Sequence, residues 1–225
     1  MKRTAFTILL AAAALSACSD NSPTPEGRLR FVDVSPDAPL LSLVLDGDTV
    51  AGNLAYLGSS EYLEVPAGGH VMQVADAEAS TTLIDQDVTV ADETDYTVLV
   101  GDTLRSIKAL VLTDNNSTPA AGTFKVRAVH AAPHAGPVDV YVTDPDADLT
   151  FATPLANHVI FGQVLPYVQT NAGTYQILVT TNGTKNVLID SGALTVESGQ
   201  IRTVIAVEAV GGGEPFNFLV LNDLD

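Results

Sequence analysis

Short runs of apolar residues, alternating or continuous, fill the chain from residue 28 to its end. The segment 41–45 (LSLVL) alternates leucine with other residues and ends at Asp46-Gly47, a dipeptide suited to a tight hairpin. The segment 138–142 (VDVYV) alternates in the same way. Turn residues break these runs every eight to twelve positions. The pattern predicts an all-β protein.

The clearest local signal is a hairpin in the second half of the chain. An apolar run at 175–180 leads into Asn182-Gly183, and a second run continues through residues 186–189. Asn-Gly between two such runs is a strong predictor of a β-hairpin. We find no segment of helical period long enough to compete, since 75–80 would form at most a turn or two.

The two halves of the chain align with each other. Three pairs of segments match at offsets of 97, 105 and 109 positions: 30–39 with 127–136, 62–68 with 167–173, and 110–114 with 219–223. Loop insertions in the second copy would produce an offset that only grows, and loops tolerate insertions at little entropic cost. We therefore expect tandem β domains at 28–114 and 123–225, joined by a polar linker at 115–122.

These repeated residues also resemble a known family. The run 126–133 (VRAVHAAP), followed by 137–142 (PVDVYV) and Tyr167 with Ala172-Gly173, is similar to the bacterial domain family DUF4397, whose members occur in lipoproteins and secreted proteins, often in tandem. The first copy departs from the pattern at 41–45. The resemblance implies immunoglobulin-like antiparallel β-sandwiches in an envelope setting, and it brings no established activity.

The first seventeen residues read as a secretion signal. Met1-Lys2-Arg3 is a basic start, and an eleven-residue, mostly apolar run follows at 5–15. Such a run rises only about 17 Å as a helix, which is too short to cross a hydrocarbon core of roughly 30 Å. Residues 1–17 are therefore expected to be cleaved rather than to span a membrane.

The end of this signal carries a more specific pattern. Leu15-Ser16-Ala17-Cys18 resembles the lipobox of bacterial lipoproteins, which implies lipidation of Cys18 and cleavage before it. The alternative is an ordinary signal peptide with a chance cysteine. Residues 18–27 are polar and read as a lipidated, flexible tether. Ser19 follows Cys18 in place of the Asp associated with inner-membrane retention, so we expect the outer membrane, at its periplasmic leaflet or at the cell surface.

The charge of the chain excludes one class of partner. Asp and Glu number 27 against 10 Lys and Arg, and the formal charge is −17. Nucleic acid is bound by neutralising phosphates with basic residues, so we expect no nucleic-acid partner. The acidic surface would also be repelled by anionic lipid, which leaves the N-terminal lipid as the membrane attachment.

Four basic residues are concentrated in the first strand of each copy. These are Arg28, Arg30, Lys125 and Arg127. They could form a basic spot that grips an acidic ligand. The favoured interpretation is that they pair with nearby acids, among them Asp139, because ion pairs usually serve structure.

Metal sites are weakly indicated. His130 and His134, with Asp139 nearby, straddle a strand end and a Pro turn rather than one helix face. Asp144, Asp146 and Asp148 alternate and are calcium candidates. The Gly and Glu of a helix-loop-helix calcium loop are absent, because Leu149 and Leu155 occupy those positions. We therefore expect no metal and no cofactor, with calcium kept as an alternative.

No catalytic motif is present. The chain lacks a Gly-x-Ser-x-Gly elbow, a Gly-rich phosphate loop, His-Glu-x-x-His and a Cys–His pair available for catalysis. We predict a lipid-anchored envelope protein with a non-catalytic binding or structural role, whose protein or glycan partner would meet the loops at 36–39 and 133–137. The alternatives are a calcium-stabilised adhesin-like module and an envelope hydrolase with a carboxylate site carried by loops.

Overall fold

The computed structural model describes residues 24–224 of the 225-residue chain. The predicted signal peptide and Cys18 lie outside these residues. Sixteen strands and three short 3₁₀ turns make up the regular structure between residues 24 and 224, with no α-helix. None of the described segments is a helix long and apolar enough to cross a membrane.

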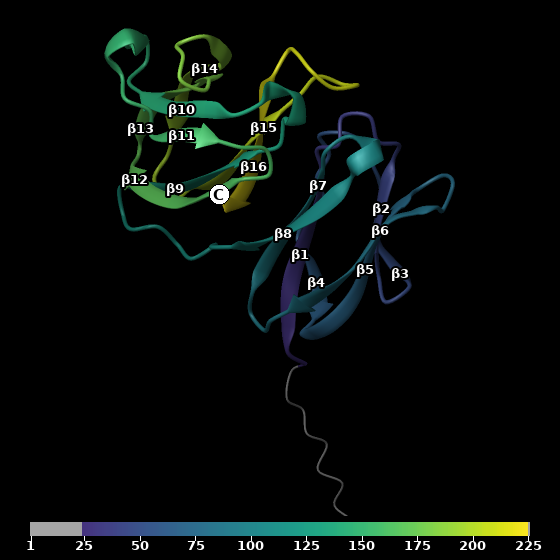
Figure 1. Cartoon of the computed structure of the whole chain (residues 1–225). Helices are drawn as coiled ribbons and strands as arrows, with labels where there is room; N and C mark the ends of the chain where they lie inside the picture. Colours follow the sequence, from purple (N-terminus) through teal and green to yellow (C-terminus); the bar gives the residue numbers. More distant parts are fainter. Residues whose placement is uncertain (1–23, 225) are drawn as a thin grey trace, which may run out of the picture.

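The first eight strands form two four-stranded sheets (Figure 1). Sheet A has the order β4-β1-β7-β8, with bounds Leu63–Pro66, Glu26–Asp33, Asp95–Gly101 and Lys108–Asp114. Sheet B has the order β3-β2-β5-β6, with bounds Asp48–Leu54, Leu41–Leu45, Gly68–Asp76 and Thr82–Val90. Together they are called the first sandwich.

The last eight strands repeat this arrangement. Sheet C has the order β12-β9-β15-β16, with bounds Val164–Asn171, Thr123–His130, Ile201–Val207 and Asn217–Leu224. Sheet D has the order β11-β10-β13-β14, with bounds Ala156–Val159, Val138–Thr143, Gly173–Thr181 and Val187–Val196. Together they are called the second sandwich.

The predicted fold class is confirmed. Neighbouring strands pair antiparallel in all four sheets, with two exceptions: β1 pairs parallel with β7, and β9 pairs parallel with β15. The two sandwiches therefore each contain one parallel strand pair, at the equivalent place in the sheet. The polar residues 115–122 connect β8 to β9.

Both hairpins predicted from turn residues are present. β2 and β3 pair antiparallel around Asp46 and Gly47, whose φ angles of 52° and 93° are both left-handed. That geometry matches the right-handed twist of the flanking strands. β13 and β14 pair antiparallel on either side of Asn182-Gly183.

Large apolar side chains fill the first sandwich. Leu29 and Phe31 of β1, Leu41 and Leu43 of β2, and Met72 of β5 belong to one cluster, and each is 0% exposed. Their alternation along the strands directs them between sheets A and B.

The opposite face of sheet A packs against sheet C, where the two lobes of Figure 1 meet. One apolar cluster joins the sandwiches: Val32, Val34, Leu99 and Leu112 from the first, and Val129, Ala131, Ile205, Val207 and Leu221 from the second. The strand registers place Val32 opposite Leu99, and Val129 opposite Ile205, at equivalent points of the two copies. The four sheets are thus stacked in the order B, A, C, D.

Candidate ligand-binding cavity

A cavity of about 530 Å³ lies between the two sheets of the second sandwich. Inward-facing side chains of both sheets make its walls, and most of them are apolar: Val126, Ala128, Val138, Val140, Ile177 and Val204. Small-molecule sites typically have volumes of roughly 300–1,000 Å³ and walls of this kind. The interior of the second sandwich is therefore large enough to hold a ligand.

The cavity exists because the second copy carries smaller side chains at aligned core positions. Phe31 corresponds to Ala128, and Val100 corresponds to Ala206. Four leucines of the first sandwich are matched by valines: Leu29, Leu41, Leu43 and Leu45 by Val126, Val138, Val140 and Val142. Protein interiors are normally close-packed, so smaller side chains leave empty space unless neighbouring residues are larger.

Exposure of the walls agrees with this difference. Phe31 is fully buried, whereas its counterpart Ala128 is only partly buried. Val142 and Leu155 on the side of sheet D are 40% and 63% exposed. Val168 and Val220 on sheet C are 46% and 45% exposed. Part of the apolar wall on both sides therefore reaches solvent.

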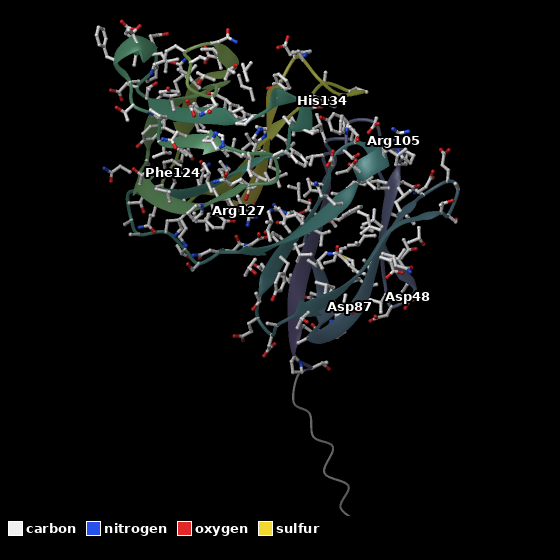
Figure 2. The ribbon with its side chains drawn as sticks, in the orientation of Figure 1. Asp48, Asp87, Arg105, Phe124, Arg127 and His134 are labelled. Atoms are coloured by element: carbon white, nitrogen blue, oxygen red, sulfur yellow. The ribbon has the colours of Figure 1, made fainter. Side chains whose placement is uncertain are left out.

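Two aromatic rings lie at one end of the cavity. The ring centroids of Phe124 and Tyr175 are 5.8 Å apart, and the Tyr175 hydroxyl donates to the carbonyl oxygen of Asn171 at 2.6 Å. Phe124 is labelled in Figure 2, at the start of β9. Tyr175 therefore contributes its ring to the wall while its polar group is already bonded.

Polar residues are a minority of the cavity lining: Arg127, His130, Thr170, Tyr175, Thr195, Gln200 and Arg202. His130 Nε2 donates to the carbonyl oxygen of Gly136 at 2.9 Å, and burial lowers the pKa of His130, so its imidazole is neutral at pH 7. Arg202 also lines the cavity, and its Nη1 donates to the carbonyl oxygen of Ile201 at 3.1 Å. The remaining walls are mostly hydrocarbon, which favours an apolar ligand.

A buried charge network holds the two sandwiches together on the other face of sheet C. Arg30 Nη2 donates to Asp223 Oδ1 at 2.6 Å and to Thr97 Oγ1 at 2.8 Å. Its guanidinium lies 4.7 Å from the centroid of the Tyr62 ring. Asp223 also accepts from the Tyr167 hydroxyl at 2.8 Å. An arginine of the first copy thus pairs with an aspartate of the second.

The reciprocal pair has the same construction. Arg127 donates through Nη2 to Asp114 Oδ1 and through Nε to Thr203 Oγ1. Its guanidinium lies 4.8 Å from the Tyr167 ring centroid, and Asp114 accepts from the Tyr62 hydroxyl at 2.6 Å. Figure 2 shows Arg127 at the junction of the two sandwiches. Each arginine side chain is less than 5% exposed, and the carboxylates are fully buried, so both pairs are shielded from solvent.

The four predicted basic residues therefore serve structure. Arg28 pairs with Asp95 at 2.6 Å, and Lys125 Nζ donates to Asn115 Oδ1 and to Ser117 of the linker. The expectation that Asp139 is one of their partners is wrong. Asp139 instead accepts hydrogen bonds at the β13–β14 turn, from Asn182 Nδ2 and from the backbone N–H groups of His158 and Gly183.

The histidine candidates are not brought together. His130 bonds to Gly136, whereas His134 Nδ1 lies 2.8 Å from Glu208 Oε2. Glu208 is fully buried, and its hydrogen bond is the main reason that the pKa of His134 is raised. Between residues 24 and 224, no group of three or more His, Cys, Asp or Glu side chains is placed to hold a metal ion.

The three calcium candidates also stay apart. Asp148 caps the 3₁₀ turn Leu149–Phe151 by accepting from the Thr150 N–H at 2.9 Å, and this bond lowers the pKa of Asp148. The backbone N–H of Asp146 donates to Gln176 Oε1 at 2.8 Å, and the carbonyl oxygen of Asp144 accepts from Ala147. The loop is thus closed by hydrogen bonds between its own residues and β13.

The loops expected to meet a ligand are partly used inside the molecule. The Pro36 carbonyl accepts from Gly211 N–H at 2.7 Å, and the Tyr56 hydroxyl donates to the Glu208 carbonyl at 2.7 Å. His134 in the second Pro-rich loop donates from its backbone to Glu208 Oε1. Both loops therefore lie at one end of the interface between the sandwiches.

Sequence reasoning missed the cavity. The repeat alignment already contained the signal, because it pairs Phe31 with Ala128 at an offset of 97. The signal is a difference in side-chain size, because both residues are apolar. Apolar pattern alone predicts a core and does not say whether the core is filled.

Comparison with solved structures finds only distant likenesses. A family 41 carbohydrate-binding module from streptococcal virulence factors, described as recognising α-glucan, is 13% identical, over 85% of this chain and 95% of that chain, with a TM-score of 0.29. A family CBM26 module of Eubacterium rectale Amy13K, solved with maltoheptaose, is 8% identical over 89% and 98%, with a TM-score of 0.26.

A putative adhesin from Bacteroides ovatus is 10% identical, over 88% of this chain and 92% of that chain, with a TM-score of 0.22. At such TM-scores these superpositions support no conclusion about the fold or the function of this chain. A search of curated protein sequences finds no match.

The sheets and the interface define a two-sandwich β protein whose second sandwich is hollow. The chain belongs to the family described as a domain of unknown function, DUF4397, whose model matches residues 27–141 and 142–225. The two matches meet at residue 141, inside β10, whereas the sheets divide between β8 and β9. The resemblance seen in the repeated residues is thereby confirmed.

Proposed function

We propose that this protein is a lipid-anchored, non-catalytic binding protein of the bacterial outer membrane, and that its second sandwich takes up a small apolar ligand. The observation that carries the binding role is the cavity of about 530 Å³. A packed first sandwich and an open second sandwich with the same strand order indicate that the loss of core volume is specific to one copy.

The cost of an open core supports this role. Large-to-small changes in a core each remove favourable contacts, typically at about 1–5 kcal/mol. Burial of apolar ligand surface would restore part of that free energy. The described residues bring no carboxylate–histidine cluster to the cavity walls, and the side-chain polar groups His130 Nε2 and the Tyr175 hydroxyl already have hydrogen-bond partners.

A fluorescent probe of apolar sites tests the binding role. 1-N-phenylnaphthylamine should bind the full chain with a strong rise in emission. Ala128→Phe restores the side chain of the first copy, and it should weaken probe binding by roughly tenfold or more because the ring occupies the cavity. The matched control is Ala193→Phe on β14, an exposed position that does not line the cavity.

Equal probe binding by the wild type and Ala128→Phe would remove the cavity from the proposal. Thermal melts of all three proteins should accompany the titrations. Ala128→Phe is expected to melt at or above the wild-type temperature, because it fills empty volume.

The anchor rests on the sequence Leu15-Ser16-Ala17-Cys18. Radiolabelled palmitate should be incorporated by the wild type and not by Cys18→Ala. Outer-membrane fractions should contain the wild type and lose the variant. Retention of Cys18→Ala in those fractions would show that another feature attaches the protein.

A further inference from the structure

We propose that the ligand of the second sandwich is a linear acyl chain, lying between sheets C and D along β9. This inference rests on the proposed binding function and specifies its ligand. It follows from the length of the cavity, the chemistry of its walls and the place where the walls reach solvent.

The cavity is long. Its lining on β9 runs from Phe124 to His130, which is nearly the whole strand. Six residue steps at about 3.3 Å each give a length of about 20 Å. An acyl chain spans one leaflet, about half of a hydrocarbon core that is roughly 30 Å thick. A single extended chain of that kind therefore fits along the strand.

The spacing of the two sheets limits the width of the cavity. Packed sheets lie about 10 Å apart, and side chains normally fill this distance. Ala128 and Ala206, which stand where the first copy has Phe31 and Val100, leave space between the sheets that larger side chains would fill. A groove between two sheets, bounded above and below by side chains of both, suits a thin chain better than a compact ring system.

The walls disfavour a sugar. Each buried hydroxyl without a hydrogen-bond partner has a substantial desolvation cost, and the walls offer mostly methyl and methylene groups. The aromatic pair at the end does not form an open stacking platform, because Phe124 is only 5% exposed. The same walls favour methylenes, each of which gains free energy on burial.

The exposed part of the wall provides an entrance of matching chemistry. Val142 and Leu155 on the side of sheet D and Val168 on β12, an edge strand of sheet C, are 40–63% exposed and line the cavity. Val220, which is 45% exposed, lies on β16 at the opposite edge of sheet C and is not part of this entrance. Apolar side chains exposed together commonly mark a ligand or lipid contact. A chain entering there would meet hydrocarbon from the first contact onward.

The test uses full-length protein carrying Cys18→Ala and purified without detergent, because detergents are themselves linear apolar chains. Bound 1-N-phenylnaphthylamine is displaced with saturated fatty acids of 8 to 18 carbons. Affinity should rise by up to about fourfold for each added methylene and then level off, once the chain exceeds the cavity. Native mass spectrometry should show one chain per protein.

Other probes define the source and shape of the ligand. A lysophospholipid and a diacyl phospholipid presented in vesicles distinguish a free fatty acid from a membrane lipid as the source of the chain. A rigid sterol that competes as well as the best fatty acid would overturn the linear-chain inference, and so would maltoheptaose. Displacement that is independent of chain length would overturn it too.

Two variants keep the result interpretable if one fails to fold. Ala128→Phe and Ala206→Val each restore a residue of the first copy, and both should reduce fatty-acid affinity, whereas Ala193→Phe should not. If the probe binds but no fatty acid displaces it, the acyl-chain inference fails and the binding function stands. If the probe itself fails to bind the wild type, the binding function fails.

Discussion

Asp33 and His130 occupy equivalent positions in the two copies, and each is a buried ionisable group. Asp33 is fully buried, Oδ1 accepts from the Ser35 N–H at 2.8 Å, and Oδ2 has no hydrogen-bond partner. Burial raises the pKa of Asp33 to about 7. At this position the second copy has a histidine whose pKa burial lowers. Burial therefore disfavours the charged form of both groups.

The stability of the protein should depend on pH through Asp33. Its folded-state pKa lies above its ordinary value of 3.8, so the stabilising contribution is complete below that value and is lost as pH rises to about 7. The slope for one proton is at most about 1.4 kcal/mol per pH unit. Asp33→Asn should lose this component, so urea melts at pH 4.5, 6 and 8 should show a smaller fall than in the wild type.

The contribution of Asp33 is the difference between the pH profiles of the wild type and Asp33→Asn, because other groups also titrate. His134 and His70 have raised pKa values from hydrogen bonds to Glu208 and Asp46, and their contributions remain in the variant. Glu61→Gln, at an exposed carboxylate, is the control. If the profiles of Asp33→Asn and the wild type run parallel, Asp33 does not carry the proton proposed for it.

The sequence predicted the structural role of the basic residues and not the identity of their partners. Arg28, Arg30 and Arg127 pair with acids as expected, whereas Lys125 bonds to Asn115 and Ser117. Their partners were not identifiable, because Arg30 meets Asp223 across 193 positions. That contact exists only once the two sandwiches have docked.

Strands and turns were the most predictable elements. The repeat offsets of 97 and 105 recur in the strand registers, where Leu43 pairs with Val74 and Val140 pairs with Val179. Alternation fixed which side chains share a face. The parallel pairing of β1 with β7 was not predicted, since strand patterns carry no information about which distant strand becomes a neighbour.

The β2–β3 hairpin offers a test of turn geometry. Gly47 has a φ of 93°, which side chains bearing a Cβ rarely adopt. Gly47→Ala should lower the free energy of unfolding by about 1–2 kcal/mol. Gly52→Ala in β3 is the matched control, because an added Cβ there meets only ordinary contacts, the nearest at 3.5 Å. Equal losses in the two variants would contradict a turn-specific effect.

At the scale of the whole molecule, the buried pairs make the two sandwiches one unit. We expect a single calorimetric transition for the wild type. Arg127→Leu removes the nearer cation of buried Asp114, leaving Arg30 at 3.9 Å, and should lower the free energy of unfolding by about 3 kcal/mol. The double variant Arg127→Leu/Asp114→Leu should lose less than the sum of its two single variants.

The shape of the transition provides a second measurement. Weakening the interface should let the sandwiches unfold separately and split the transition in two. Arg28→Leu, at a pair whose arginine is 50% exposed, is the control and should cost at most about 1 kcal/mol. Additive losses at Arg127 and Asp114 would mean that the pair does not couple the two sandwiches.

The crossed pairing of Arg30 with Asp223 and Arg127 with Asp114 also bears on the origin of the chain. Residue i of one copy contacts residue j of the other, and j contacts i, which is the signature of an isologous dimer. A single-sandwich ancestor carrying one such arginine and one such aspartate would satisfy both bonds by associating with itself. Gene fusion would then preserve the dimer within one polypeptide and allow one half to keep a filled core while the other diverged.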